Sequence, residues 1–437
     1  MPSDSSSPRS YVGFGFGAIQ VGLFLYEAQH SGAFGRLAVA EVMAERVAQV
    51  RRAGGCVGLN IAHADCVERT RVGPVEILDT ASDDDVRRLA DLLAEATDIG
   101  TAVPGVSCYA DGGQRSLAAL LAAGLARKTE RGGPPAVVYA AENHNHAAEI
   151  LEAHVLAALE PRRRDAVRRR VRFVNTVIGK MSGVVTDPQT IGRQGLVPMT
   201  GEGDAALLVE AFNRILISRV DADGAAGPLR CGFPPFEEKA DLLPFEEAKL
   251  YGHNATHALA AAVGALLGLE RICQLPEVPG AMTFLRDAFL RESGASLVRK
   301  HRSVDPLFTA RGYRRYADDL LERMVNPLLG DTVARVGRSP ERKLGWDDRF
   351  IGTIRLATAQ RIQPRRYAFG AAATAAQLDA ALLADGASAA DLLAHLWSAA
   401  DAPPDERAAA VAHVDRGLSR LRAWLRAGRP PLEECFR

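Results

Sequence analysis

The chain has 437 residues, a length that predicts two domains. It carries 53 Lys and Arg and 53 Asp and Glu residues, so its formal charge is zero. The basic residues are scattered, which argues against a nucleic-acid-binding protein. The six cysteines show no CxxC spacing and no metal-type pairing with histidine, which predicts a reduced, cytoplasmic protein without a metal site.

The first ten residues, MPSDSSSPRS, are polar and lack the apolar core of a signal peptide, so we expect residues 1–10 to be a disordered tail. Tyr11 and Val12 then begin a short strand that turns into a helix through a glycine-rich segment. Such a turn lets the backbone approach a pyrophosphate, and the helix N-terminus supplies amide donors. A glycine-rich turn of another α/β protein is the alternative. The expected dinucleotide contacts are Gly13, Gly15, Phe16, Gly17, Ala18 and Ile19.

A second apolar run, residues 37–40, ends in Glu41, where an acidic residue would accept a hydrogen bond from the adenosine ribose. A carboxylate at this position repels a 2′-phosphate. The sequence therefore predicts NAD as the preferred cofactor over NADP. Arg46 lies nearby in the sequence and leaves room for some tolerance of NADP.

The rest of the first half alternates between helix and strand, as in a Rossmann-type domain. Three of its strands end in residues suited to a ligand site at the carboxyl edge of a parallel sheet. The segment 98–103 opens into a loop after its strand, Asn143 follows the strand 136–141, and Asn175 follows the strand 171–174. Further helices are predicted at 44–53, 83–96 and 162–170, and further strands at 57–61 and 75–78.

From about Phe236 the chain consists mostly of alanine- and leucine-rich helices, among them 404–426. We therefore expect a Rossmann-type dinucleotide-binding domain over 11–235 and a mostly α-helical domain over 236–437. The segment PFEE occurs twice, and its first copy, from Pro235, is interpreted as a turn or linker. The apolar helix 255–267 is too short to span a bilayer, so we expect a buried core helix and no membrane partner.

Lys249, Asn254 and His257 lie in KLYGHNATH, a helix-forming stretch. At about 100° per residue the three side chains fall within an arc of roughly 140°, so they can converge on one cleft. A lysine in an apolar wall can act as a base near neutral pH, an asparagine amide can donate to a substrate oxygen, and a histidine can orient it. The alternative is a solvated lysine, a helix-capping asparagine and a core histidine.

Four cations lie within a dozen residues: Arg338, Arg342, Lys343 and Arg349. Arginine binds phosphate through two parallel hydrogen bonds, so this cluster predicts a substrate with a phosphate or another anion. The alternative is an ion-paired surface turn.

Together these segments resemble the mannitol dehydrogenase family of long-chain polyol dehydrogenases. The resemblance rests on GFGFGAIQ with Glu41, DIGTAV, the AEN strand end, VNTV, KLYGHNATHALAA and RSPERKLGWDDRFIG, which occur in the family's order and cover nearly the whole chain. The last segment resembles the mannitol-1-phosphate 5-dehydrogenase branch. The resemblance implies a metal-independent, NAD-dependent oxidoreductase that interconverts a sugar alcohol, or its phosphate, and the ketose. Mannitol 1-phosphate and fructose 6-phosphate are the expected pair.

By position, the resemblance implies that Lys249 is the general base. It implies that Asn254 holds the reacting oxygen, with Asn143 as a second donor, and that His257 binds a neighbouring hydroxyl. The remaining implied contacts are Thr101, Ala102, Val103 and Asn175 on the cofactor side and His253 on the substrate side. Family members are often monomers, so a monomer is expected, with a dimer as the alternative.

Departures from the family pattern leave the substrate open, among them Ser339, which replaces the usual aspartate, and Lys180, which stands where many relatives have arginine. Another polyol, a sugar acid or a cyclitol is therefore an alternative substrate. A dehydrogenase of the 6-phosphogluconate or hydroxyacid type and a non-catalytic NAD-binding regulator are the alternative classes of protein.

Overall fold

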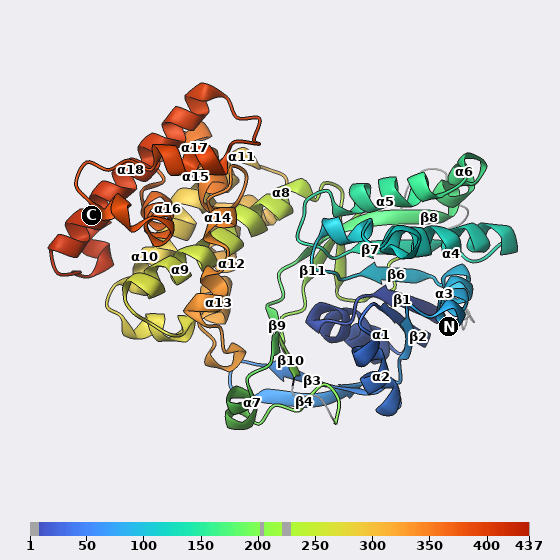
Figure 1. Ribbon diagram of the computed structural model, residues 1–437. Helices are drawn as coiled ribbons and strands as arrows, with labels where there is room; N and C mark the ends of the chain where they lie inside the picture. Colours follow the sequence, from blue (N-terminus) through green and yellow to red (C-terminus); the bar gives the residue numbers. More distant parts are fainter. Residues whose placement is uncertain (1–7, 202–204, 221–228, 437) are drawn as a thin grey trace. The chain divides into compact units, whose positions relative to one another are not determined.

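The computed structural model describes residues 8–201, 205–220 and 229–436 (Figure 1). The chain divides into two compact units, Met1–Leu242 and Leu243–Arg437, which we call the sheet unit and the helical unit. Of the expected tail, residues 1–7 lie outside the described residues. Residues 9 and 10 are not a tail, because the Arg9 guanidinium lies 2.7 Å from the buried Asp98 carboxylate and so holds the start of the first strand.

The sheet unit is built on an eight-stranded sheet with β1 near its middle, in the order β12-β11-β8-β7-β6-β1-β2-β5. Its strands run parallel except where β11 meets β8. The bounds are β1 (Arg9–Phe14), β2 (Phe34–Glu41), β5 (Glu76–Asp79), β6 (Asp98–Thr101), β7 (Ala136–Ala140), β8 (Val171–Ile178), β11 (Ile215–Ser218) and β12 (Phe236–Lys239).

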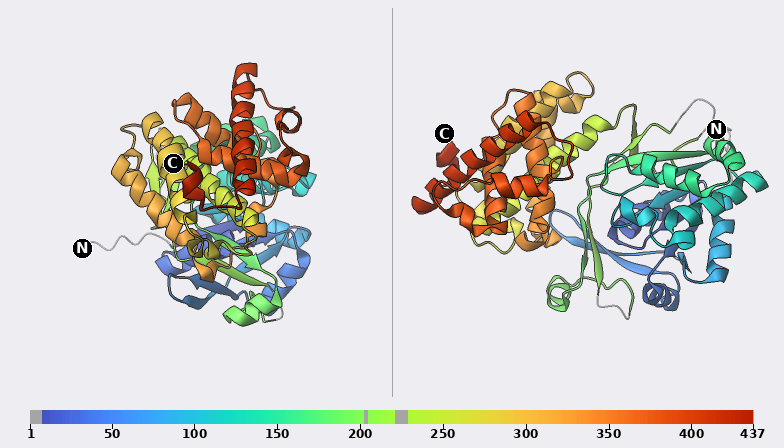
Figure 2. Two further views of the ribbon diagram at one scale, coloured as in Figure 1. Left: turned by 90° about the vertical axis from the view of Figure 1, so that its left-hand side faces the viewer. Right: turned by 45° about the horizontal axis from the view of Figure 1, so that its top comes forward.

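Alternating side chains of each strand pack on opposite faces of this sheet. On one face, Val12 and Phe14 join a core with the helices α3 to α6, which lie together in the ribbon views (Figure 1, Figure 2). On the other face, Tyr11 packs with the helix that follows β1. The helices of this unit are η1 (Gln20–Leu25), α1 (Tyr26–Ser31), α2 (Ala44–Arg52), α3 (Asp83–Glu95), η2 (Val106–Tyr109), η3 (Gly113–Arg115), α4 (Leu117–Arg131), α5 (Ala147–Ala158), α6 (Pro161–Arg170) and α7 (Pro188–Gln194).

A second, four-stranded sheet covers η1, in the order β4-β3-β10-β9. Its strands are β3 (Val57–Ala62), β4 (Val67–Val72), β9 (Ser182–Val185) and β10 (Ala206–Glu210). Contact with η1 is close at Gly22, where a Cβ would lie 2.5 Å from Val209 Cγ1. The sequence did not predict β4, because this strand is largely exposed and most of its residues are polar.

Two sequence interpretations are corrected here. Asn175 lies inside β8, which continues to Ile178, because β11 pairs with that end of the strand. The first PFEE copy is not a linker, since residues 236–239 form β12 and pair with β11. The sheet unit accordingly extends past residue 235, to Leu242.

The helical unit packs around α9 and α16. A Cβ at Gly370 of α16 would lie 2.5 Å from Leu259 of α9, so the small residue permits the close approach of the two helices. The elements are α8 (Leu243–Glu247), η4 (Ala248–Asn254), α9 (Ala255–Leu266), η5 (Ile272–Glu277), α10 (Ala281–Asp287), η6 (Ala288–Gly294), α11 (Ala295–Lys300), η7 (Pro306–Phe308), α12 (Ala310–Met324), η8 (Pro327–Leu329), α13 (Val333–Gly337), α14 (Pro340–Lys343), α15 (Arg349–Ala359), α16 (Arg365–Leu378), η9 (Ala380–Leu383), α17 (Ala390–Leu396), α18 (Pro404–Arg426) and η10 (Leu432–Phe436).

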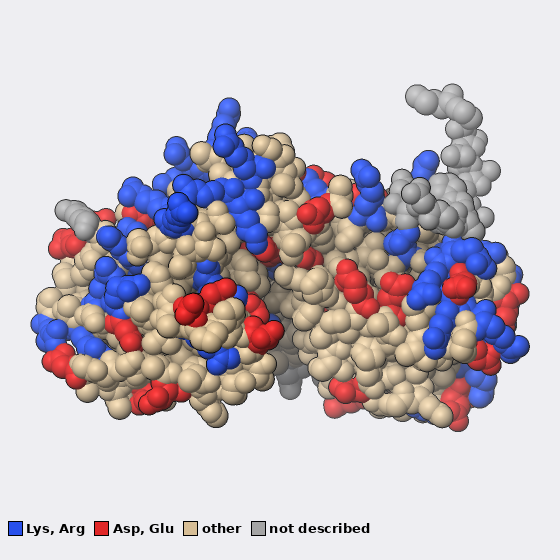
Figure 3. Space-filling view, turned by 90° about the horizontal axis from the view of Figure 1, so that it is seen from above, with Lys and Arg blue, Asp and Glu red and all other residues tan. Residues whose placement is uncertain are grey.

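Surface charge is mixed in sign. On the face shown in Figure 3, acidic side chains lie among the basic ones on both units. Within the described parts of the chain, no helix combines the length and the apolarity needed to cross a membrane.

Candidate active site

The glycine-rich turn after β1 has the shape that its sequence predicts. Gly15 adopts a left-handed conformation with φ of 82°, and a Cβ there would lie 2.8 Å from the carbonyl oxygen of Ala102. Gly13 leaves room for the amide of Gln20, which donates to the Tyr11 hydroxyl at 2.7 Å. Side chains at either glycine would therefore disturb the turn, whereas a Cβ at Gly17 would meet no atom within 4 Å.

The predicted ribose ligand, Glu41, is a buried carboxylate that already holds this turn. It accepts hydrogen bonds from the backbone N–H of Phe16 at 2.9 Å, Val42 at 2.7 Å and Met43 at 2.9 Å. A carboxylate offers about four acceptor positions, so one remains for a ribose hydroxyl. Arg46 lies 4.0 Å from the same carboxylate.

Two apolar side chains beside Glu41 were missed by the sequence analysis. Val42 is 74% exposed and Met43 is 49% exposed, directly after the strand end that carries Glu41. Exposed apolar groups at the carboxyl edge of a parallel sheet suit contact with a planar heterocycle such as adenine. Single exposed apolar residues are common on protein surfaces, so the sequence alone does not mark these two residues as ligand contacts.

At the ends of β6 and β7, a buried carboxylate fixes the loop that was predicted to line the nicotinamide. Glu142 accepts hydrogen bonds from the Thr101 hydroxyl at 2.8 Å, from the Val103 N–H at 3.0 Å and from the Tyr109 hydroxyl. Burial raises the pKa of this carboxyl. The neighbouring Asn143 is exposed. Glu142, which the sequence analysis overlooked, therefore sets the path of Thr101, Ala102 and Val103.

Replacing Tyr109 with phenylalanine is expected to lower the free energy of unfolding by about 1.5–3 kcal/mol, because a hydrogen bond to a buried carboxylate is lost. Urea unfolding of the purified protein measures the change. Tyr26→Phe is the control, since among the described residues the hydroxyl of this half-buried tyrosine makes no hydrogen bond. Equal effects of the two substitutions would contradict the role of Glu142 as an anchor.

Asn175 points its side chain at α5. Its Oδ1 accepts from the Ala148 N–H at 2.8 Å, and its Nδ2 donates to Glu149 at 2.8 Å. Both ends of the amide are thus engaged with the first turn of α5. Its predicted contact with the cofactor stays a prediction.

Three of the four predicted catalytic residues, Lys249, Asn254 and His257, lie on one helix, which runs from α8 through η4 into α9, whereas Asn143 follows β7 in the sheet unit. The central part, residues 248–254, is a π-helix and carries Lys249, His253 and Asn254. A π-turn forms i→i+5 hydrogen bonds, so each residue turns through less than the 100° or so of an α-helix. Less rotation therefore accumulates between Lys249 and His257, and the two side chains lie nearer to one face than α-helical spacing predicts.

The surroundings of these three side chains differ from one another. Lys249 is half-buried, and burial, followed by the positive charge of Arg349, lowers its pKa to about 8. Asn254 makes no side-chain capping bond to α9. Burial also lowers the pKa of His257 to about 3, so this imidazole is neutral. The helix thus presents a lysine that titrates near physiological pH beside neutral polar groups.

Glu246 is a second acidic residue that sequence reasoning missed. It is buried three positions before Lys249, and its negative charge opposes the lowering of the Lys249 pKa. Side chains three apart on a helix are neighbours, so the spacing was the available signal.

The four cations differ in their surroundings. Arg349 begins α15, its side chain is 18% exposed, and it donates to Asp348 at 2.6 Å. Its charge lowers the pKa values of Lys249, His253, His257 and Lys343. Arg342, by contrast, is 60% exposed and pairs with Asp348 at 3.3 Å. Arg349 is therefore the member of the cluster whose charge acts on the pKa of Lys249.

Lys343 is the buried member of the cluster, and its amine donates to the carbonyl oxygen of Arg338. Burial, followed by the charge of Arg349, lowers its pKa to about 8. Ser339 adopts a left-handed φ of 55° and precedes α14. Arg338 itself is exposed.

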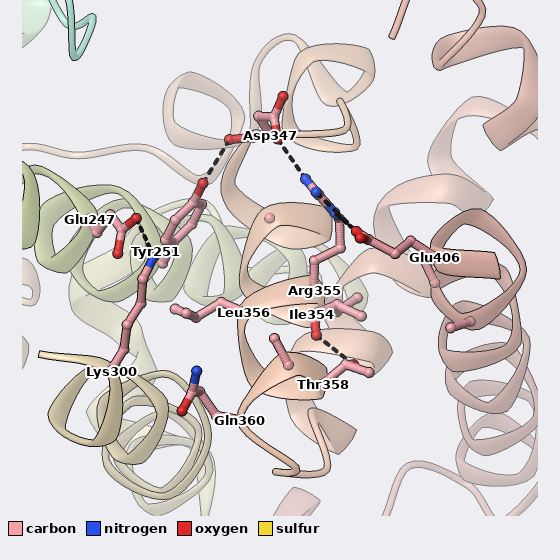
Figure 4. Close-up of a pocket in the computed structure, with 14 residues that line it drawn as sticks. Glu247, Tyr251, Lys300, Asp347, Ile354, Arg355, Leu356, Thr358, Gln360 and Glu406 are labelled. Atoms are coloured by element: carbon pink, nitrogen blue, oxygen red, sulfur yellow. Dashed lines mark hydrogen bonds and ion pairs between the residues drawn. The ribbon is translucent and has the colours of Figure 1, made fainter. Parts of the chain in front are cut away.

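The helical unit also contains a cavity of about 480 Å³ beside the same helix (Figure 4). Glu247 and Tyr251 line it, and each is two positions from Lys249 along the helix, so the cavity faces roughly the opposite side of the helix. Its charged groups already pair with one another, as Glu247 does with Lys300 at 2.7 Å and Arg355 with Glu406 at 3.1 Å. This cavity is thus distinct from the surface that carries Lys249. Among the residues that can be described, no cluster of three His, Cys, Asp or Glu side chains could hold a metal ion.

Two solved structures share this architecture. D-sorbitol dehydrogenase in substrate-free form aligns with a TM-score of 0.72 and 15% identity over 97% of this chain and 94% of that one. A Pseudomonas fluorescens mannitol 2-dehydrogenase, in a ternary complex with NAD and D-mannitol, aligns with a TM-score of 0.69 and 16% identity over 97% and 93%. The predicted fold, a Rossmann-type domain with a mostly helical second domain, is confirmed.

Sequence comparison extends the likeness beyond the fold. A family model for the mannitol dehydrogenase C-terminal domain matches residues 241–381. A mannitol-1-phosphate 5-dehydrogenase of Bacillus licheniformis is 30% identical over 312 residues, which are 71% of this chain and 73% of that protein. The enzyme of that name from Geobacillus thermodenitrificans is 32% identical over 236 residues, 54% of this chain and 55% of that protein. The chain belongs to the mannitol dehydrogenase family.

Proposed function

We propose that this chain interconverts mannitol 1-phosphate and fructose 6-phosphate, with NAD as the hydride carrier and without a metal ion. As a member of its family it is an NAD-dependent polyol dehydrogenase. The observation that carries the phosphate assignment is the placement of Arg349, a cation whose charge acts on Lys249. The names of the two bacterial relatives support the same substrate pair.

In the proposed reaction, the neutral amine of Lys249 takes the proton of the substrate hydroxyl as the hydrogen on the carbon that bears this hydroxyl leaves with its electron pair. NAD supplies the hydride acceptor. The Asn254 amide donates to the oxygen, on which negative charge develops, and His257 binds a neighbouring hydroxyl. Asn143, after β7, is proposed as a second donor. A base and preorganised amide donors are what an alkoxide-like transition state requires.

For the cofactor, the turn at Gly13 to Ala18 would hold the pyrophosphate, and the remaining acceptor position of Glu41 would take a ribose hydroxyl. Val42 and Met43 would contact the adenine. These assignments fit the left-handed Gly15 and the exposure of the two apolar side chains.

A substrate screen tests the proposal directly. The purified protein is mixed with NADH and either fructose 6-phosphate or fructose, and the loss of the ultraviolet absorbance of reduced nicotinamide is followed. We expect the phosphorylated ketose to be reduced far more efficiently, because each charge-assisted hydrogen bond to phosphate contributes about 1.5–3 kcal/mol. Comparable rates with both ketoses would assign the chain to a neutral-polyol branch of the family.

The discrimination between NAD and NADP is expected to depend on Glu41. In Glu41→Ser the KM for NAD should rise about tenfold or more, because the carboxylate holds the Phe16 N–H as well as the ribose. The difference in kcat/KM between NAD and NADP should become smaller. Initial rates with both cofactors measure the two effects. Glu41→Gln, which keeps an acceptor for the backbone, should change the KM for NAD less. A wild-type protein that uses both cofactors equally well would overturn this prediction.

A further inference from the structure

Two buried polar atoms of the helical unit face each other without a hydrogen bond. His257 Nε2 lies 3.4 Å from Asp331 Oδ2, and neither atom has a hydrogen-bond partner within the described residues. An unpaired buried polar group costs about 1–3 kcal/mol, and more when it is charged. A small rotation of the imidazole would bring the two atoms to a hydrogen-bond distance of about 2.8 Å and remove that cost.

The carboxylate is the fixed partner of this pair. The Asp331 side chain is 3% exposed, and its carbonyl oxygen accepts from the Ile272 N–H at 3.0 Å. The next residue, Thr332, forms a β-bridge with Arg271. Arg335 contacts the other carboxylate oxygen. Backbone pairing and an ion pair therefore hold Asp331 in place, whereas the imidazole can turn about its own bonds.

Burial and the nearby positive charges leave the His257 imidazole neutral. Burial, followed by the charges of Arg335, Arg349 and Lys343, lowers its pKa to about 3. A neutral imidazole carries one N–H, and the group that accepts it decides which of the two nitrogens is the donor and which is the acceptor. The His257 side chain is 16% exposed although Nε2 is buried, so its accessible part lies away from Asp331.

We infer that Asp331 is a positioning residue, which accepts the Nε2–H of His257 and thereby leaves Nδ1 as the acceptor for a substrate hydroxyl. The inference rests on the proposed function, in which His257 binds such a hydroxyl. Carboxylates orient imidazoles in this way in both metal sites and catalytic triads. Asp331 acts through His257 and touches no reacting atom itself.

Asp331→Asn is the informative substitution, because an asparagine can turn its NH₂ group toward Nε2 and so admit the other tautomer. We expect kcat to fall by a factor on the order of 10 to 10², the scale on which catalytic geometry responds to small displacements. The KM for NAD should stay near its wild-type value. Asp287→Asn is the control, because Asp287 pairs with an arginine, Arg366, at 2.9 Å, as Asp331 pairs with Arg335. This control should keep wild-type kcat.

A double-mutant comparison separates positioning from a general loss of stability. In a His257→Ala background, Asp331→Asn should lower kcat no further, because the group through which it acts is gone. An equal loss of kcat in both backgrounds would show that Asp331 serves only the fold and would overturn the inference.

The tautomer itself gives a readout that does not depend on the substrate. In protein labelled with ¹⁵N at histidine, the His257 resonances, identified by their absence in His257→Ala, should report the Nε2–H form in the wild type and a mixture in Asp331→Asn. An Nδ1–H form in the wild type would refute the inference even if the enzyme oxidises polyols. The Nε2–H form in a protein that turns over no polyol would instead refute the proposed function and leave the pairing intact.

Discussion

Replacement of Lys249 by alanine is expected to lower kcat for polyol oxidation by a factor on the order of 10² to 10⁴, because the reaction loses its general base. The affinity for NADH, measured by fluorescence titration, should remain near the wild-type value, since the predicted cofactor contacts lie in the sheet unit. Lys300→Ala is the matched control. This lysine pairs with Glu247 at 2.7 Å and lines the cavity on the other side of the helix that carries Lys249. A Lys249→Ala enzyme with near-normal kcat would remove the assignment.

The pH dependence of the wild-type enzyme follows from the same residue. Lys249 must be neutral to accept a proton, and its pKa is lowered to about 8. The rate of oxidation should therefore rise as the pH passes upward through about 8. Reduction of the ketose needs the protonated amine, so its rate should fall over the same interval. Profiles of kcat/KM in the two directions with equal signs of slope would exclude Lys249 as the acid–base group.

Replacement of Arg349 by alanine is expected to raise the KM for fructose 6-phosphate roughly 10- to 100-fold, as the loss of a charge-assisted phosphate contact predicts. The KM for NADH should stay unchanged. Because the Arg349 charge lowers the pKa of Lys249, its removal should also move the pH profile upward. Steady-state kinetics at several pH values measures both effects in one series.

Arg342→Ala is the matched control for Arg349→Ala. It removes the same kind of side chain from the same cluster, but Arg342 is 60% exposed and pairs with Asp348 in solvent. We expect a smaller rise in the KM for fructose 6-phosphate than in Arg349→Ala, and no shift of the pH profile that reports the pKa of Lys249. If neither substitution changes the KM for the phosphorylated ketose selectively, the cluster is an ion-paired surface turn and the phosphate assignment fails.

Local patterns were sufficient to predict the cofactor side of the fold. The turn at Gly13 and Gly15 depends on contacts within one strand-turn-helix unit, so glycine spacing reports it. The strand ends near Thr101 and Asn143 were equally visible, because buried parallel strands are continuous apolar runs. The helix that carries Lys249, Asn254 and His257 was predicted because these three residues lie close together in the sequence.

The remaining features depend on residues that are distant in the chain. Nothing near His257 in the sequence points to Asp331, which reaches it only because α13 packs on α9 through Val333 and Gly264. In the same way, Asn175 was expected to face a ligand, and only the packing of α5 shows what its amide holds. The first PFEE copy has the same letters as the helical one, and its pairing with β11 makes it a strand.

The π-helical segment at 248–254 sets the phase between the candidate catalytic side chains. Relative to an α-helix, it holds one surplus residue, which a π-turn accommodates by turning less per residue. Eight regular α-helical steps from Lys249 to His257 would turn through about 800° and leave the two side chains about 80° apart around the helix. Seven regular steps turn through about 700°, so loss of one residue from this segment would give a more regular helix and would still leave the lysine and the imidazole on one face.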